Sequence, residues 1–230
     1  MRTETLVKEI YSFEELTEAA KQKAIDDVRN SPHYLDHDWW EFTYENWKEK
    51  LLEHGFDATE TKYRMSYKWD SENKKRVENG KKHFTETTIN FSGFWSQGDG
   101  ASFTAKSVDV CTWILKNEPV KYARLIKLCK SNALYLSGKV VRDRWCHYVH
   151  HNTISFYLND EFQGDYKSNL NNIEQLLEEL ERNIQEHAMS LSKDIYEDLE
   201  EDYEYQMSNE AIQEHIEANE YEFEENGSRY

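Results

Sequence analysis

Carboxylates are the chemical groups that this chain offers in the densest pattern. Six of them fall within eight residues near the C-terminal end, at Glu197, Asp198, Glu200, Glu201, Asp202 and Glu204. On a helix, carboxylates at i and i+4 lie about 6 Å apart, which is close to the spacing of phosphates along a nucleic-acid strand. Such a helix can occupy a basic surface that otherwise binds nucleic acid. We therefore predict a partner-binding site at Glu197, Asp198, Glu201, Asp202 and Glu204; the alternative is a charged face that is only solvated.

The charge of the chain is very unevenly distributed. Residues 169–230 hold 19 acidic and 3 basic residues, and so carry 16 of the 17 net negative charges. Residues 1–168 hold 26 acidic and 25 basic residues. This predicts a nearly neutral α+β body at 1–168 and an acidic helical region at 169–230, docked on the body or on a second copy as a homodimer. The overall negative charge argues against direct contact with nucleic acid or an anionic membrane, so we expect a protein partner with a basic surface.

A loop is the second candidate site. Residues 91–103 read FSGFWSQGDGASF, with a glycine on each side of Asp99. Glycine permits positive φ and a close approach of another group. Trp95, Gln97, Asp99 and Ser102 place hydrogen-bonding groups beside aromatic rings, a mixture typical of a ligand pocket. The alternative is a tight turn between strands whose aromatic rings belong to the core.

Metal and catalytic motifs are weak in this sequence. Cys146, His147, His150 and His151 are close together, and His147 and His151 would share a face of a strand, but no second cluster has matching spacing. The sequence holds no GxSxG or HExxH motif. We therefore predict a non-enzymatic protein with no metal and no cofactor. Three cysteines without a CxxC pair, no apolar N-terminal stretch and no membrane-length apolar window predict a cytoplasmic protein.

The periodicity of apolar residues predicts the elements that position these groups. Helical spacing predicts helices at 12–29 and 36–54, the second ended by Gly55. Alternation at Tyr63, Met65, Tyr67 and Trp69 predicts a half-buried strand, joined by a polar connection at 70–82 to a partner strand at 84–94. Further strands are predicted at 103–108, 140–145 and 153–158, short helices at 111–116 and 120–130, a long helix at 173–203 and a last helix after Ser208.

These elements together predict an α+β fold. An antiparallel sheet of about four or five strands would pack with the N-terminal helices and with a long C-terminal amphipathic acidic helix. The apolar stripe of that helix runs from Ile173 to Tyr203 in steps of three and four residues. The stripe would face the sheet, so the acids would face outward.

Three stretches carry a resemblance to a known family. They are residues 11–16 followed by Trp39-Trp40, the FSGFWSQGDGASF motif at 91–103, and residues 203–223. Together they resemble a family of small proteins encoded by tailed bacteriophages and prophages, some of which are labelled antitoxins of a toxin–antitoxin stability system. The resemblance implies a phage protein acting in the host cytoplasm, and it implies no particular reaction.

The leading hypothesis is thus a phage-encoded, non-enzymatic acidic protein that binds and inhibits a host protein. A defence factor or nucleic-acid-handling factor is the expected target, and mimicry of nucleic acid, as in anti-CRISPR-like DNA mimics, is the expected mode. Two alternatives stay open. The chain is a ligand-binding or enzymatic protein that uses the Gln97–Ser102 loop, or it is an antitoxin that neutralises a co-encoded toxin.

Overall fold

The computed structural model describes residues 8–35, 38–71, 74–143, 147–163 and 171–230. The chain forms two compact units, one made of residues 1–41 and 199–230 and the other of residues 42–198. We call them the terminal unit and the sheet unit. The long helix α5 (Asn171–Gln206) contributes to both, with the division after Asp198. The boundaries of these units differ from the predicted boundary at residue 168, where the charge of the chain changes. The reason is that the two ends of the chain belong to one unit.

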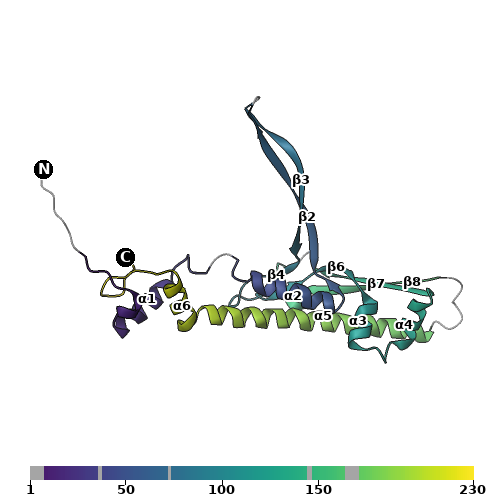
Figure 1. Cartoon of the computed structure of the whole chain (residues 1–230). Coiled ribbons are helices and arrows are strands. Elements are labelled where there is room, and N and C mark those ends of the chain that lie inside the picture. Colours follow the sequence, from purple (N-terminus) through teal and green to yellow (C-terminus); the bar gives the residue numbers. More distant parts are fainter. Residues whose placement is uncertain (1–7, 36–37, 72–73, 144–146, 164–170) are drawn as a thin grey trace. The chain divides into compact units, whose positions relative to one another are not determined.

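The sheet unit contains the predicted antiparallel sheet. Its four strands are in the order β1-β6-β7-β8, and a separate two-stranded sheet pairs β4 with β5 (Figure 1). The α+β class and the sheet size are therefore confirmed. The bounds are Phe56–Asp57 (β1), Ile89–Phe91 (β4), Ala101–Phe103 (β5), Ala105–Val108 (β6), Leu134–Arg142 (β7) and Ile154–Phe162 (β8).

The sheet unit also contains the helices α2 (Glu41–Glu53), α3 (Val110–Asn117) and α4 (Ala123–Lys130) and the short 3-10 helix η2 (His151–Thr153). Gly55 follows α2 at φ +86°, as predicted, and a Cβ there would lie 2.5 Å from the carbonyl oxygen of Asp109. Asp109 in turn caps α3, since its Oδ1 accepts from the Thr112 N–H at 3.0 Å. The turn after α2 and the start of α3 are thus packed against each other so closely that only glycine fits.

The apolar stripe of helix α5 is buried against other parts of the same chain. Leu180, Ile184, Ala188 and Ile195 are fully buried. Polar residues beside the stripe pair with the outer strand β8: the Leu158 N–H donates to Glu181 at 3.0 Å, and Gln185 both donates to the Ile154 carbonyl and accepts from the Phe156 N–H. These bonds occupy backbone groups of an edge strand. A second copy of the chain is not needed to cover this part of the stripe.

A long hairpin differs from what alternation predicts. Strands β2 (Thr59–Asp70) and β3 (Lys75–Thr87) pair from Thr59↔Thr87 to Asp70↔Lys75. The segment predicted as a connection at 70–82 therefore lies mostly within β3, and the partner strand predicted at 84–94 is divided between β3 and β4. The prediction failed because β3 is exposed on both faces and so has no apolar period to reveal it.

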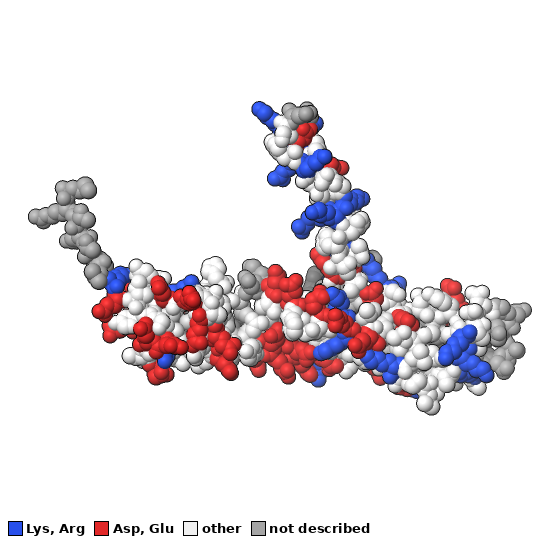
Figure 2. All heavy atoms as spheres, in the orientation of Figure 1, with Lys and Arg blue, Asp and Glu red and all other residues white. Residues whose placement is uncertain are grey.

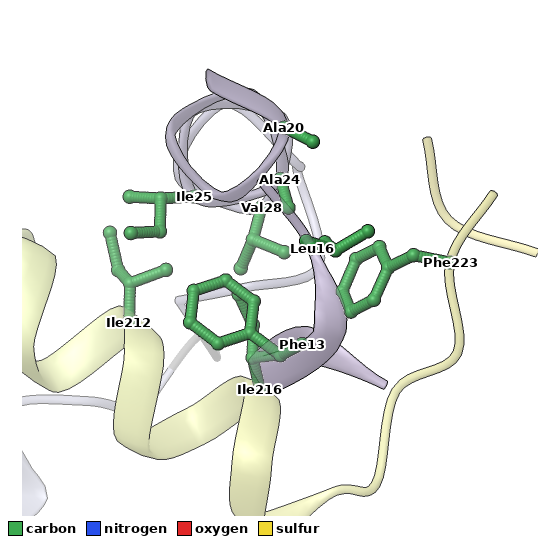
Figure 3. Close-up of a cluster of buried hydrophobic side chains, with 9 residues drawn as sticks. All are labelled: Phe13, Leu16, Ala20, Ala24, Ile25, Val28, Ile212, Ile216 and Phe223. Atoms are coloured by element: carbon green, nitrogen blue, oxygen red, sulfur yellow. The ribbon is translucent and has the colours of Figure 1, made fainter. Parts of the chain in front are cut away.

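The terminal unit is built around a nine-residue apolar cluster from both chain ends (Figure 3). It contains η1 (Phe13–Glu15), α1 (Glu18–Arg29) and α6 (Asn209–Ala218). The helix predicted at 12–29 is interrupted, because Leu16 is extended and Thr17 starts α1 by accepting from the Ala20 N–H at 3.3 Å. The start of α6 agrees with prediction, since Ser208 accepts from the Ala211 N–H at 3.2 Å. Of the two predicted N-terminal helices, only α2 belongs with the sheet.

A half-buried histidine, His187, makes the stability of the sheet unit depend on pH. The Trp113 indole donates to His187 Nδ1 at 2.8 Å, and His54 packs on His187 with ring centroids 4.9 Å apart. Burial, assisted by the positive charges of His54 and Lys116, lowers the pKa of His187 to about 4. Protonation of Nδ1 would also remove the lone pair that accepts from Trp113.

We expect the stability of the sheet unit to fall as the pH drops from about 6.5 to about 4. The pKa of His187 is higher in the unfolded chain than in the folded one, so the unfolded state binds the proton first as the pH falls. After allowance for partial solvent exposure, the loss between neutral pH and pH 5 is about 1–2 kcal/mol. Urea unfolding at the two pH values measures it, and His187→Gln should reduce the difference. An equal loss in both proteins would exclude His187 as the cause.

Candidate functional site: an acidic groove in the terminal unit

Negative charge is concentrated in the terminal unit. Its two segments, 1–41 and 199–230, contain 21 acidic and 6 basic residues, a net charge of −15. The sheet unit contains 24 acidic and 22 basic residues. Figure 2 shows acidic side chains gathered over the region of α1 and α6. In the sequence the excess is visible only at the C-terminal end, because basic residues of 42–168 offset the ten acids of the first 41 residues when residues 1–168 are counted together.

A groove of about 530 Å³ lies within this unit. Residues 10–15 form one side, and the end of α6 with the turn after it forms the other. Its lining combines apolar groups with five carboxylates, and none of the described residues that line it is Lys or Arg. The apolar members are Ile10, Tyr11, Phe13, Ile216 and Tyr221, and the carboxylates are Glu14, Glu15, Glu217, Glu220 and Glu222.

Two local features hold the walls of the groove together. Tyr11 and Phe223 exchange backbone hydrogen bonds, both of 2.9 Å, which tie the N-terminal segment to the C-terminal tail. Helix α6 ends in a left-handed turn, with Glu220 at φ +51° and the Tyr221 N–H bonded to the Ile216 carbonyl at 3.2 Å. This turn reverses the chain, so acids before and after it line the same groove.

The electrostatics of the groove favour a bound cation. The Ser12 N–H and hydroxyl donate to the Glu15 carboxylate at 2.8 and 3.0 Å, and these hydrogen bonds lower the pKa of Glu15. Glu14, Glu217, Glu220 and Glu222 are exposed. An apolar floor beneath a carboxylate rim suits a lysine or arginine side chain, whose stem is apolar and whose head is charged. The groove therefore has the chemistry of a binding site for a basic peptide segment.

The five acids predicted as a partner site do not line this groove. Asp198 accepts from the Trp47 indole at 2.9 Å and from Lys50 at 3.2 Å, and so helps to hold α2 against α5. Glu197 pairs with Lys193, one turn earlier, at 3.2 Å. Asp202 accepts from Gln206 at 3.5 Å. The remaining two, Glu201 and Glu204, are exposed. Their contact with a partner stays a prediction.

In the loop at 91–103, Asp99 holds the turn together. Asp99 accepts from the Ser96 N–H at 2.7 Å, and the Ser96 carbonyl accepts from the Asp99 N–H at 3.0 Å. Ser102 is completely buried in β5, whereas Trp95 is 78% exposed and Gln97 is exposed. The four predicted ligand-loop residues thus do not converge. This geometry favours the structural turn over the pocket rim.

The glycines of this loop also have a packing role. Gly98 lies at φ +89°, and a Cβ there would fall 1.9 Å from the Tyr148 ring. The close approach that the sequence attributes to a ligand is therefore made by an aromatic side chain of the same chain.

The histidine cluster forms no metal site in the part of the chain that is described. His150 and His151 stack with ring centroids 4.0 Å apart, and His150 Nδ1 accepts from the Asn152 N–H at 3.2 Å. Cys146 lies outside the described residues. Among the described residues, no group of three or more His, Cys, Asp or Glu could hold a metal ion. In the same part of the chain, no helix has the length and apolar character needed to cross a membrane.

The fold and the groove together define an α+β protein with a highly acidic terminal unit. The chain belongs to a family described as a domain of unknown function (DUF8835), whose model matches residues 39–209. The match includes the β2–β3 hairpin, the four-stranded sheet and all of α5, but it ends before most of α6. No curated protein and no solved structure matches the chain.

Proposed function

We propose that this chain is a non-enzymatic binding protein that takes up a basic segment of a partner protein in the acidic groove. The observation that carries the proposal is the groove itself, which is lined by five carboxylates and five apolar side chains within a unit of net charge −15. Charge complementarity of this kind speeds association and makes it sensitive to salt.

The finer form of the proposal names the partner class. A basic surface complementary to the groove is typical of proteins that handle nucleic acid, which need positive charge to bind phosphates. Together with the resemblance to phage-encoded proteins, this supports a phage protein that inhibits a host nucleic-acid-handling or defence factor, by nucleic-acid mimicry in the host cytoplasm. Glu201, Asp202 and Glu204 of α5, which belong to the same unit as the groove, would extend the contact.

Reversing three groove charges tests the site. We expect Glu217→Lys/Glu220→Lys/Glu222→Lys to weaken binding of a fluorescent lysine peptide at least about tenfold at low salt, because each reversal replaces an attraction by a repulsion. Fluorescence anisotropy measures the affinity, and raised salt should weaken binding to the wild-type chain more than to the variant.

A matched control separates the groove from charge in general. Glu174→Lys/Glu178→Lys/Glu186→Lys changes the net charge equally at three exposed positions of α5 within the sheet unit, and it should change affinity about twofold or less. Glu197→Lys/Glu201→Lys/Glu204→Lys tests the α5 acids directly. Equal loss in all three variants would mean that the peptide responds only to net charge, and the groove would lose its role.

An antitoxin is a special case of the same binding chemistry. The partner would then be a basic toxin encoded beside this chain. Co-expression of the neighbouring gene with the wild-type chain or with the groove variant distinguishes this case, because only an antitoxin would restore growth through an intact groove.

A further inference from the structure

The β2–β3 hairpin presents large aromatic side chains to solvent. Tyr63, Tyr67 and Trp69 are 59%, 54% and 62% exposed, although their alternation predicts a half-buried strand. Figure 1 shows both strands continuing away from the rest of the sheet unit. Burial of apolar side chains therefore contributes little to the stability of this hairpin. Exposed aromatic groups gathered on one element indicate a binding surface.

Positive charge accompanies these rings. Between Arg64 and Lys82 the sequence holds seven basic and three acidic residues, a net charge of +4 in a chain of net charge −17. The seven are all exposed, and Figure 2 shows basic side chains along the length of the hairpin. They are Arg64, Lys68, Lys74, Lys75, Arg76, Lys81 and Lys82.

Strand register sets the aromatic rings and some of these cations on one face. Residues 63, 65, 67 and 69 share a face because side chains alternate along a strand. Across the hairpin, Trp69 pairs with Arg76, Tyr67 with Glu78 and Met65 with Lys81, with a register shift between Met65 and Tyr67. Lys81 Nζ lies 4.4 Å from the centroid of the Tyr63 ring. The three aromatic rings therefore share one face with Arg76 and Lys81, and also with Glu78 opposite Tyr67.

Near the base of the hairpin, two of its acids are paired with lysines. Lys62 pairs with Glu86 at 2.6 Å, and Lys106 of β6 pairs with Glu60 at 2.6 Å. The excess of positive charge is thus left toward the tip. At about 3.3 Å per residue the tip lies roughly 35 Å from the base, and physiological salt screens exposed charges beyond about 8 Å. The net charge of the chain, on which the sequence-based argument against nucleic acid rested, does not decide what the hairpin attracts.

We propose that the β2–β3 hairpin binds single-stranded nucleic acid. Exposed rings give bases a stacking platform, and lysines and arginines beside them follow the phosphates. The combination favours a single strand over a duplex, because the bases of a duplex are already stacked on one another. This site is separate from the acidic groove, and neither proposal depends on the other.

The test uses the full chain and labelled oligonucleotides of about 20 nucleotides, namely oligothymidine, oligouridine and a DNA duplex. We expect fluorescence anisotropy to show binding of a single strand that weakens between about 50 and 200 mM salt. Tyr67→Ala and Trp69→Ala should each weaken it about 5- to 100-fold. Lys75→Glu/Arg76→Glu/Lys81→Glu should weaken it at least about tenfold and reduce the slope of log affinity against log salt by about 2.

The matched control is Arg124→Glu/Lys127→Glu/Lys130→Glu, which reverses three exposed charges on α4 and should change affinity about twofold or less. Circular dichroism checks that each variant is folded. The proposal is overturned if neither single strand binds, if the duplex binds more tightly, or if hairpin variants and control behave alike. It is also overturned if anionic phosphatidylserine vesicles, and not the oligonucleotides, bind in a hairpin-dependent way.

Discussion

Trp113→Ala is expected to destabilise the sheet unit by about 3–5 kcal/mol, the range for removing a buried tryptophan. Trp113 is 2% exposed, and its ring packs against Tyr122 and His187 with centroids 6.5 and 5.8 Å away. The substitution leaves a cavity between α3 and α5 and also removes the hydrogen bond to His187 Nδ1. Guanidinium unfolding followed by circular dichroism measures the change.

Two variants divide this effect into its causes. Trp113→Phe retains much of the ring but leaves His187 Nδ1 without its donor, so we expect a smaller loss of about 1–3 kcal/mol. Leu115→Ala on the same helix removes a side chain that is 54% exposed and should cost about 0.5 kcal/mol or less. A loss for Trp113→Ala no larger than that for Leu115→Ala would contradict the packing of α3 against α5.

Phe223→Ala is expected to cost the terminal unit about 3–5 kcal/mol. Phe223 is 1% exposed and packs on Phe13 with ring centroids 6.2 Å apart. Its backbone pairs with Tyr11 on one side and Arg229 on the other. Because nine of the described residues form the buried cluster of this unit, one lost aromatic ring removes a large share of its apolar contact. Hydrogen exchange of the Tyr11 and Phe223 amides should become faster.

The same substitution should abolish binding of the lysine peptide, because the Tyr11–Phe223 pairing holds the two walls of the groove together. Tyr230→Ala is the matched control, since Tyr230 is 62% exposed in the same tail. Unchanged protection of both amides in Phe223→Ala would show that the cluster does not hold the tail.

Local patterns predicted most helices of this protein and the presence of an antiparallel sheet, but they missed β1 and the first part of β7. The step of three and four residues from Ile173 to Tyr203 corresponds to α5, and Ser208 and Gly55 mark helix ends where expected. These features are readable because capping, glycine geometry and burial of one face act on residues that are near in sequence. Most of the β3 strand was not predicted, because a strand that is exposed on both faces shows no alternation of apolar and polar residues.

The groove could be predicted only in part. The acids that line it are visible in the sequence, but they come from residues 14–15 and 217–222, about 200 residues apart. The densest acidic run, which the sequence favours as a binding site, includes Asp198, whose carboxylate accepts from Trp47 and Lys50. A dense run of acidic residues in the sequence does not show which of their carboxylates form hydrogen bonds that stabilise the fold.

The sequence by itself determined the α+β class, the excess of negative charge and the long amphipathic helix, because composition and short-range periodicity suffice for these. Only the tertiary structure decided that the two chain ends form one unit, that the acids of both ends share a groove, and that the aromatic row of β2 faces solvent. These outcomes depend on contacts between residues far apart in sequence. Alternation of apolar and polar residues indicates which side chains share a face of a strand, but it does not indicate whether another element packs against that face.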